Sequence, residues 1–250
     1  MRIKIAHASL QYSDTPQQHT DDLEKLFAQG YDIISGTEAG AGANNTRTEL
    51  KRVCKKYGYK LSRKDKYDTW NAVRADLIEP GSFKAGAVHI LERSEEEAPN
   101  QPGRWLAQGL VFSTFTIPGI GEISMGTVHT LTWKSTYTWY KIQTDKLFAK
   151  TLGKWFKKKA RGKDLGFCAG DFNRKDKPND LFFGEPITSC WDELKKYPKN
   201  THGLIDAIGS YDKDVRVRCV GARSFTDKQF FLNSDHDLIL ALYEIEPLQN

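Results

Sequence analysis

The chain has no long apolar run and no segment typical of protein export. None of its segments reaches the ~18 consecutive apolar residues that a membrane-spanning helix needs. The first ten residues, MRIKIAHASL, contain too short an apolar run for a signal peptide. We therefore expect a cytoplasmic protein of a bacterium or a phage-infected cell, without a membrane partner.

Cysteine is also scarce. The 250 residues include only Cys54, Cys168, Cys190 and Cys219. None of these forms a CxxC pair or has histidines at the intervals of a zinc site. We expect four buried thiols in a reducing compartment.

Internal repeats and low-complexity linkers are absent, so we expect one domain over residues 1–250. Hydrophobic residues make up 39% of the chain and charged residues 28%, which favours a packed core and a well-solvated surface. The net charge of +5 is compatible with a polyanionic partner but does not establish one.

Short apolar segments recur along the chain, several with the period of two that is typical of half-buried strands. They predict strands at 2–8, 31–36, 86–91, 109–117, 122–129, 165–170, 203–208 and 237–245. Pro118, Gly119 and Gly121 predict a hairpin turn between the fourth and fifth of these strands. The segment 92–103, ERSEEEAPNQPG, is expected to be an exposed loop.

Helical patterns are fewer. Residues 46–49 have the spacing of a capping box, and Leu50, Val53, Cys54 and Tyr57 then share one helical face that Gly58 can end. A shorter helix ends at Gly30, and the longest is expected at 138–159. Many strands with few helices favour two face-to-face sheets with helices outside.

Polar or titratable residues stand where several predicted strands end. They are Glu38, His129, Asp171, Asn173, Asp206, Asp235 and His236. If these ends converge, the carboxylates repel one another unless a cation or a proton compensates. Oxygen-rich groups suit Mg²⁺, Mn²⁺ or Ca²⁺, and such an ion beside histidines can hydrolyse a phosphate ester.

Each of these residues also has a structural explanation. Glu38 can be a solvated turn residue, and Asp171 and Asn173 can form a turn. Asp206 stands inside an apolar segment, where an unpaired carboxylate would cost several kcal/mol, so it needs a partner.

The order of the motifs distinguishes these explanations. KIAHAS, GTEAG, GAVHIL, GTVHT, AGDFN, LIDAI and SDHDLI follow one another from residue 4 to residue 239. In that order the chain resembles the endonuclease/exonuclease/phosphatase superfamily, the group of deoxyribonuclease I. The resemblance implies a four-layered α/β sandwich, with two mixed β-sheets face to face and flanking helices.

The resemblance also implies a metal site for Mg²⁺ or Mn²⁺, with Glu38 as principal ligand and Asp235 as its helper. His236 would contact the scissile phosphate, and Asp206 would bind this histidine and raise its pKa.

Three further roles follow from the resemblance. Asp171 would orient or deprotonate the attacking water, Asn173 would hold that water and the phosphate, and His129 would donate a proton or contact the phosphate. A histidine at this last position favours the deoxyribonuclease I and phosphatase branches over abasic-site repair.

One position departs from the pattern. The family usually ends its first strand in an Asn that supports the metal and phosphate, and Ser9 stands there in this chain. His7 or Gln11 could compensate, or metal affinity and activity could be weaker. Ser9 is the only support for a non-catalytic binding module on the same fold.

The substrate is the least determined property. Arg174 and Lys175 follow the GDFN motif and would meet neighbouring phosphates at the cleft rim. We expect a monomeric, divalent-metal-dependent phosphodiesterase that acts on nucleic acid as a low-specificity DNA endonuclease. The alternative is a phosphatase or phosphodiesterase for a small or lipid phosphate.

Overall fold

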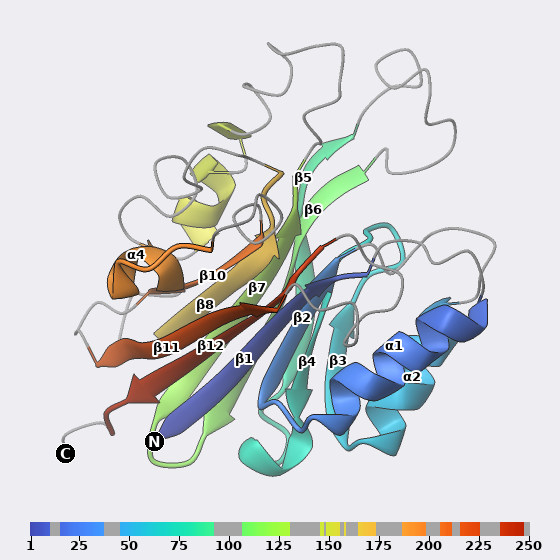
Figure 1. Ribbon diagram of the computed structural model, residues 1–250, viewed down its shortest axis with the longest axis horizontal. Coiled ribbons are helices and arrows are strands. Elements are labelled where there is room, and N and C mark those ends of the chain that lie inside the picture. Colours follow the sequence, from blue (N-terminus) through green and yellow to red (C-terminus); the bar gives the residue numbers. More distant parts are fainter. Residues whose placement is uncertain are drawn as a thin grey trace.

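The computed structural model consists of two β-sheets with helices beside them (Figure 1). It describes residues 1–10, 16–37, 46–92, 107–130, 146–147, 149–155, 158, 165–173, 187–198, 206–211, 216–225 and 236–247.

The first sheet, called sheet A, has six strands in the order β11-β12-β1-β2-β4-β3. Their bounds are β1 Arg2–Ser9, β2 Ile33–Thr37, β3 Tyr59–Arg63, β4 Trp70–Arg74, β11 Val217–Phe225 and β12 Leu238–Ile245. Only β1 and β2 are parallel, and their register pairs Ser9 with Thr37 where both strands end.

The second sheet, called sheet B, has the order β5-β6-β7-β8-β10-β9. Its strands are β5 Lys84–Glu92, β6 Ala107–Ile117, β7 Gly121–His129, β8 Leu165–Asp171, β9 Thr188–Ser189 and β10 Asp206–Tyr211. Here β7 and β8 form the parallel pair, which ends with His129 beside Asp171. The central pairs of both sheets end at the same edge of the sandwich (Figure 1).

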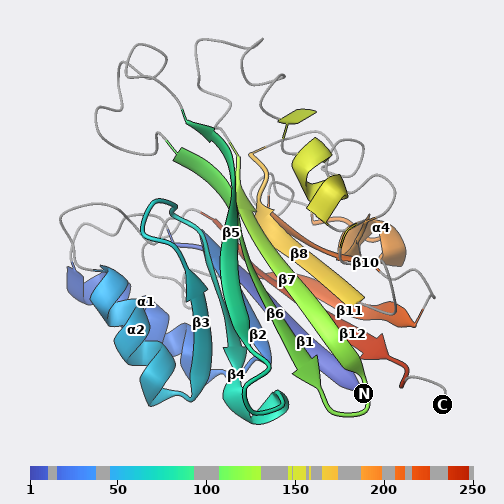
Figure 2. The same ribbon diagram turned by 180° about the vertical axis from the view of Figure 1, so that it is seen from behind.

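Helices cover the outer faces. The helices α1 (Pro16–Ala28) and α2 (Thr46–Lys56) pack side by side on sheet A, where Leu23, Leu26 and Leu50 join one apolar cluster (Figure 2). The short helix α4 (Cys190–Leu194) and the helical residues 149–155 lie on the side of sheet B. The expected sandwich of two mixed sheets with flanking helices is therefore confirmed.

The sequence located most of these elements. The predicted hairpin is present, since β6 and β7 are antiparallel and joined by a turn at 118–120. Gly58 and Gly30 follow α2 and α1 with φ of 75° and 67°, as expected for helix ends. The loop expected at 92–103 lies almost entirely outside the described residues, as do parts of the helix expected at 138–159.

Four strands were missed, and one was misplaced. β3, β4, β9 and β11 had not been predicted; β9 is only two residues long, and β11 has a mixed pattern of buried and exposed residues. The strand expected at 203–208 runs from Asp206 to Tyr211, so Asp206 is its first residue.

The cysteines fulfil their prediction. All four are free and buried. Burial raises the pKa of the Cys54 and Cys219 thiols to about 12, so both stay protonated near neutral pH. Among the described residues, no helix has the length and apolarity needed to span a bilayer.

Candidate active site

The strand β8 brings Asp171 to the edge of the sandwich. All seven of its residues are buried, and the Asp171 side chain is 1% exposed. Gly170 allows close approach to β7, because a Cβ there would lie 2.3 Å from the carbonyl oxygen of Val128. The carboxylate is therefore held by a tightly packed parallel pair rather than by a loop.

Asn173 turns the chain immediately after this strand. Its φ of 48° lies in the left-handed region, which Asn tolerates better than most residues. Its backbone N–H donates to Asp171 Oδ1 at 2.8 Å, and its Nδ2 donates to the Thr130 carbonyl at 2.9 Å. The turn thus orients the Asp171 carboxylate and links the ends of β7 and β8.

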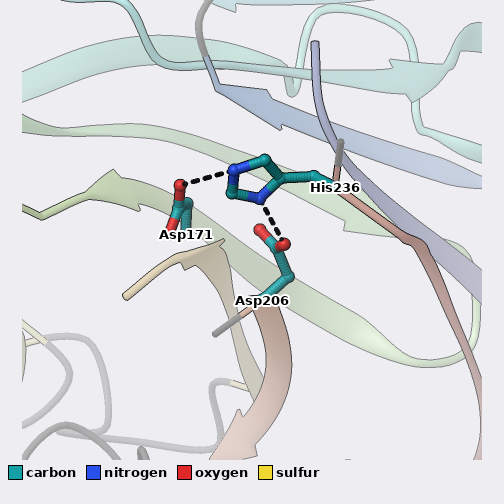
Figure 3. A group of neighbouring side chains, drawn as sticks. All are labelled: Asp171, Asp206 and His236. Atoms are coloured by element: carbon teal, nitrogen blue, oxygen red, sulfur yellow. Dashed lines mark hydrogen bonds and ion pairs between the residues drawn. The ribbon is translucent and has the colours of Figure 1, made fainter. Parts of the chain in front are cut away.

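Two more of the expected residues lie beside Asp171, with Asp206 on the neighbouring strand β10 and His236 on the sheet A side (Figure 3). His236, just before β12 in sheet A, binds Asp206 of β10 through Nδ1, 2.8 Å from Oδ2. Its Nε2 lies 3.8 Å from Asp171 Oδ2. The expected pairing of Asp206 with His236 is present, and it presents the second ring nitrogen to Asp171.

His129 approaches the same oxygen of Asp171. Its Nε2 lies 3.5 Å from Asp171 Oδ2, and its Nδ1 contacts Asp68 through a short hydrogen bond. Asp171 therefore stands between two imidazoles, each held at its other nitrogen by a second carboxylate.

Asp68 was not among the residues expected from the sequence. It precedes β4, a strand that the sequence pattern did not indicate, and it follows a polar turn at 64–67. Its side chain is 4% exposed. A burial this deep for a loop carboxylate implies a partner, but only the fold reveals that the partner is His129.

Burial and charge act in opposite directions on Asp206. Its side chain is fully buried, which alone would raise the pKa of the carboxyl group. The positive charge of His236 and its hydrogen bond, with smaller contributions from His7, outweigh burial and lower this pKa below its usual value. The carboxylate form of Asp206 is therefore stabilised.

The sheet A strand ends contribute neutral groups to this edge. Thr37 Oγ1 donates to Ser9 Oγ at 2.8 Å, and both side chains are buried. The remaining expected residues, Glu38, Asp235, Arg174 and Lys175, lie outside the described part of the chain. The structure brings together the other five, namely His129, Asp171, Asn173, Asp206 and His236.

The described donors are compatible with a divalent cation. One ligand atom each from Asp171, Asp206 and His236 lies within 4.8 Å of the others. Carboxylate oxygens are the donors that Mg²⁺ and Mn²⁺ prefer, and the absence of thiolates from this group argues against a structural zinc site. Asp171 and Asp206 also lie close enough for their negative charges to require compensation.

Several solved structures share this fold, although no protein-family model and no curated protein matches the sequence. A humanised TDP2 from D. rerio superposes with a TM-score of 0.70 at 15% identity, covering 97% of this chain and 99% of that one. D. rerio TDP2 in complex with a single-strand DNA product gives 0.66 at 16% identity, with 97% and 99% covered.

A bacterial structure is equally similar. An endonuclease/exonuclease/phosphatase family protein from Bacteroides thetaiotaomicron gives a TM-score of 0.69 at 15% identity, covering 98% of this chain and 96% of that one. At these identities the similarity establishes the fold, which is the one that the sequence motifs predicted.

Proposed function

We propose that this protein is a divalent-metal-dependent phosphodiesterase that cleaves DNA. The observation that carries the proposal is the position of Asp171, whose Oδ2 lies 3.5 Å from His129 and 3.8 Å from His236. A carboxylate between two imidazoles can accept a proton beside groups that donate protons. The shared fold and the DNA product bound to one TDP2 structure support this choice.

The attacking water would be handled by Asp171. Its Oδ1 accepts the Asn173 backbone N–H, which leaves Oδ2 directed toward the histidines. In this position Asp171 would orient the water and accept its proton. Because the Asn173 amide nitrogen donates to Thr130, the amide oxygen of Asn173 is the atom left to contact the water.

The two histidines would stabilise the charge that develops on the phosphate. Asp206 favours the imidazolium form of His236 and fixes its orientation, so Nε2 can donate to a phosphoryl oxygen. His129, held by Asp68, would protonate the leaving oxygen. General acid or base help of this kind is typically worth ~10²–10⁴ in rate.

The metal ion would be held by Glu38 and Asp235, with Asp171 close by. A bound Mg²⁺ or Mn²⁺ supplies positive charge that polarises the phosphate and lowers the pKa of a coordinated water. Glu38 directly follows Thr37, the last residue of β2, and Asp235 directly precedes His236. Both ligands therefore neighbour described residues of the site in sequence.

DNA binding would use the backbone phosphates. Arg174 and Lys175 follow the Asn173 turn directly in sequence, and the chain carries a net charge of +5. A protein that grips phosphates through such residues loses affinity steeply as salt rises. Cleavage of DNA should therefore decline between 50 and 200 mM NaCl far more than hydrolysis of a small phosphoester, if ~3 or more phosphates are contacted.

The test is the nicking of supercoiled plasmid with Mg²⁺, with Mn²⁺ and with EDTA. We expect metal-dependent nicking that falls by ~10²–10⁴ in Asp171→Asn and is lost in Glu38→Ala. Asp76→Asn is the matched control, because its side chain is 68% exposed and pairs with Arg74, the last residue of β4.

Other outcomes separate the alternatives. A folded protein that leaves the plasmid intact but releases phosphate from small phosphoesters would be a phosphatase on the same site. Nicking that persists in Asp171→Asn would contradict the role of this carboxylate. Neither activity with either metal would leave a binding module and overturn the proposal.

A further inference from the structure

A histidine that the proposed mechanism does not use lies beneath the site. His7, on β1, is fully buried, and its Nε2 lies 3.3 Å from Oδ1 of the fully buried Asp206. The two atoms face each other at ion-pair distance, and neither has a hydrogen-bond partner among the described residues. The other oxygen of Asp206 binds His236, so one carboxylate lies between two imidazoles.

The far side of His7 begins a chain of hydroxyl groups. Its Nδ1 lies 3.1 Å from Ser35 Oγ, and Ser35 Oγ lies 3.0 Å from Thr127 Oγ1. All three side chains are completely buried. Ser35 belongs to β2 of sheet A and Thr127 to β7 of sheet B, so this chain crosses between the sheets.

Asn71 continues the chain and fixes its direction. Its Nδ2 donates to the Val111 carbonyl at 3.4 Å and to Thr127 Oγ1 at 3.3 Å, while its Oδ1 accepts from Ser113 Oγ at 2.7 Å. A carbonyl only accepts, so the amide orientation is determined. Thr127 Oγ1 therefore accepts from Asn71, and its own hydrogen is available for donation to Ser35.

The carboxylate end requires the same direction. Asp206 in its ionised form only accepts, so His7 must carry its proton on Nε2. With the proton on Nε2 only, Nδ1 of His7 accepts and Ser35 donates to it. Both ends thus agree on one arrangement, in which every donor from Asn71 onward points toward Asp206.

We propose that His7 is a positioning residue that holds Asp206 through Nε2–H and thereby sets the orientation of His236. This inference rests on the proposed function for its catalytic consequence. The structural part of the inference does not depend on that function, because the tautomer of His7 and the hydrogen bond of the His236 ring can be measured in the protein without substrate. The role differs from that of a core histidine, whose loss would affect only stability.

The first measurement is the ring ¹⁵N spectrum of histidine-labelled protein at pH 7. We expect His7 to be neutral with its proton on Nε2, and the His236 Nδ1 proton to resonate far downfield because it is bound to Asp206. In His7→Leu this His236 signal should shift or broaden, and in His7→Gln, which retains a donor near Asp206, it should be kept. A proton on Nδ1 of His7, or an unchanged His236 signal in His7→Leu, would overturn the proposal.

Kinetics provide the second measurement. We expect kcat of His7→Leu to fall by ~10–100-fold with KM nearly unchanged, as when a supporting residue behind an active group is lost, and His7→Gln to recover most of it. His19→Gln is the matched control, since His19 is a buried histidine of α1 outside sheet A.

If the His7 variants do not fold, Ser35→Ala tests the same arrangement. Ser35→Ala removes the donor to Nδ1 while leaving both residues of the Asp206 contact, and it should move the Nδ1 resonance of His7 without abolishing folding. An Nδ1 resonance unchanged in Ser35→Ala would contradict the arrangement. If the wild-type protein cleaves no phosphoester, the proposed function fails while the spectra still decide the role of His7.

Discussion

The two sheets arrange their strands in the same way around their central pairs, yet the ends of these pairs carry different chemical groups. In sheet A, the hairpin β11–β12 flanks β1, and β4 and β3 flank β2. In sheet B, the hairpin β5–β6 flanks β7, and β10 and β9 flank β8 in the same manner. In each sheet the central parallel strands are consecutive strands of the chain.

The correspondence extends to individual residues. Leu10 donates its backbone N–H to the Thr37 carbonyl at 3.2 Å, and Thr130 does the same to Asp171 at 2.9 Å. The matched strand ends are therefore Ser9 with His129 and Thr37 with Asp171. Sheet A ends in two hydrogen-bonded hydroxyls, and sheet B ends in an imidazole and a carboxylate.

The difference shows how the fold builds one site from two similar halves. Three carboxylate–imidazole contacts cross between the sheets: Asp206 of sheet B with His236 and with His7 of the sheet A side, and His129 of sheet B with Asp68. In each contact, one sheet supplies the carboxylate and the other sheet supplies the imidazole. The site is therefore complete only when the two sheets are packed together.

The largest expected effect in this comparison concerns the pair that joins Asp68 to His129. His129→Gln should lower the nicking rate by ~10²-fold, the lower end of the usual range for a general acid, and Asp68→Asn should do nearly the same. Because both act through one imidazole, the double variant should be no slower than His129→Gln alone. Single-turnover kinetics on plasmid would measure all three rates.

A substitution at the corresponding strand ends of sheet A should have a much smaller effect on the nicking rate. Thr37→Ser keeps the hydroxyl that donates to Ser9 and should change the rate by only a few fold. Multiplicative losses in the double variant would show that Asp68 and His129 act separately. Such losses would contradict the proposal that Asp68 acts by orienting His129.

The residues of this comparison show what the sequence could and could not predict. Asp171 and Asp206 were found because a carboxylate at or within an apolar segment is conspicuous, and His236 because it belongs to a motif shared with a known fold. The short apolar segments likewise located the four strands of the two central pairs, but not their parallel pairing. Each of these motifs is short and local, and their order along the chain supplied the rest of the prediction.

The missed residues depend on long-range packing. Asp68 meets His129 across 61 positions, and His7 meets Ser35 across 28. His7 had been considered only as a substitute for the Asn that Ser9 replaces, whereas its ring points to Asp206 in the core. A residue on a predicted strand reveals its face from its neighbours, but the polar group opposite it is known only once the two sheets are docked.

A moderate effect is expected at the glycines before the matched strand ends. A Cβ at Gly170 of β8 would lie 2.3 Å from the Val128 carbonyl oxygen, and one at Gly36 of β2 would lie 2.3 Å from the Trp70 ring. Both alanine variants should lose ~1–3 kcal/mol of unfolding free energy, the usual cost of overpacking. Urea denaturation followed by fluorescence would measure this loss.

The atoms that an added Cβ would meet differ at the two glycines, so the substitutions that could relieve the contact also differ. At Gly36 the added methyl group would meet the side chain of Trp70. A smaller ring there makes room, so adding Trp70→Phe should recover part of the stability lost by Gly36→Ala. The obstacle to Gly170→Ala is the backbone of β7, so no neighbouring side chain can relieve it, and the displaced Asp171 should also slow cleavage. Equal activity in the two stable alanine variants would show that the tight β7–β8 approach does not position Asp171.

The smallest effect is expected far from the strand ends, in the helical layer on sheet A. Hydrogen bonds from Lys56, then from Tyr57 and Arg52, lower the pKa of Glu24 to about 2 from an ordinary 4.5. Because the folded-state pKa is depressed, this stabilisation is present above pH 4.5 and is lost as the pH falls toward 2. Glu24 is near the surface, where solvent screens such pairs, so Glu24→Gln should cost only ~0.5–1 kcal/mol at pH 7.

Urea denaturation of Glu24→Gln and the parent at pH 7, 4 and 3 would test this, with the difference shrinking as the pH falls. Asp21→Asn is the control on the same helix, since Asp21 accepts from Gln17 instead of a cation. The nicking rate should be unchanged in both variants, because the described side chains of α1 and α2 contribute no group to the site. A fall in rate with Glu24→Gln would mean that the helices on the outer face of sheet A affect the position of the residues at the strand ends. The site would then depend on this layer as well as on the two sheets.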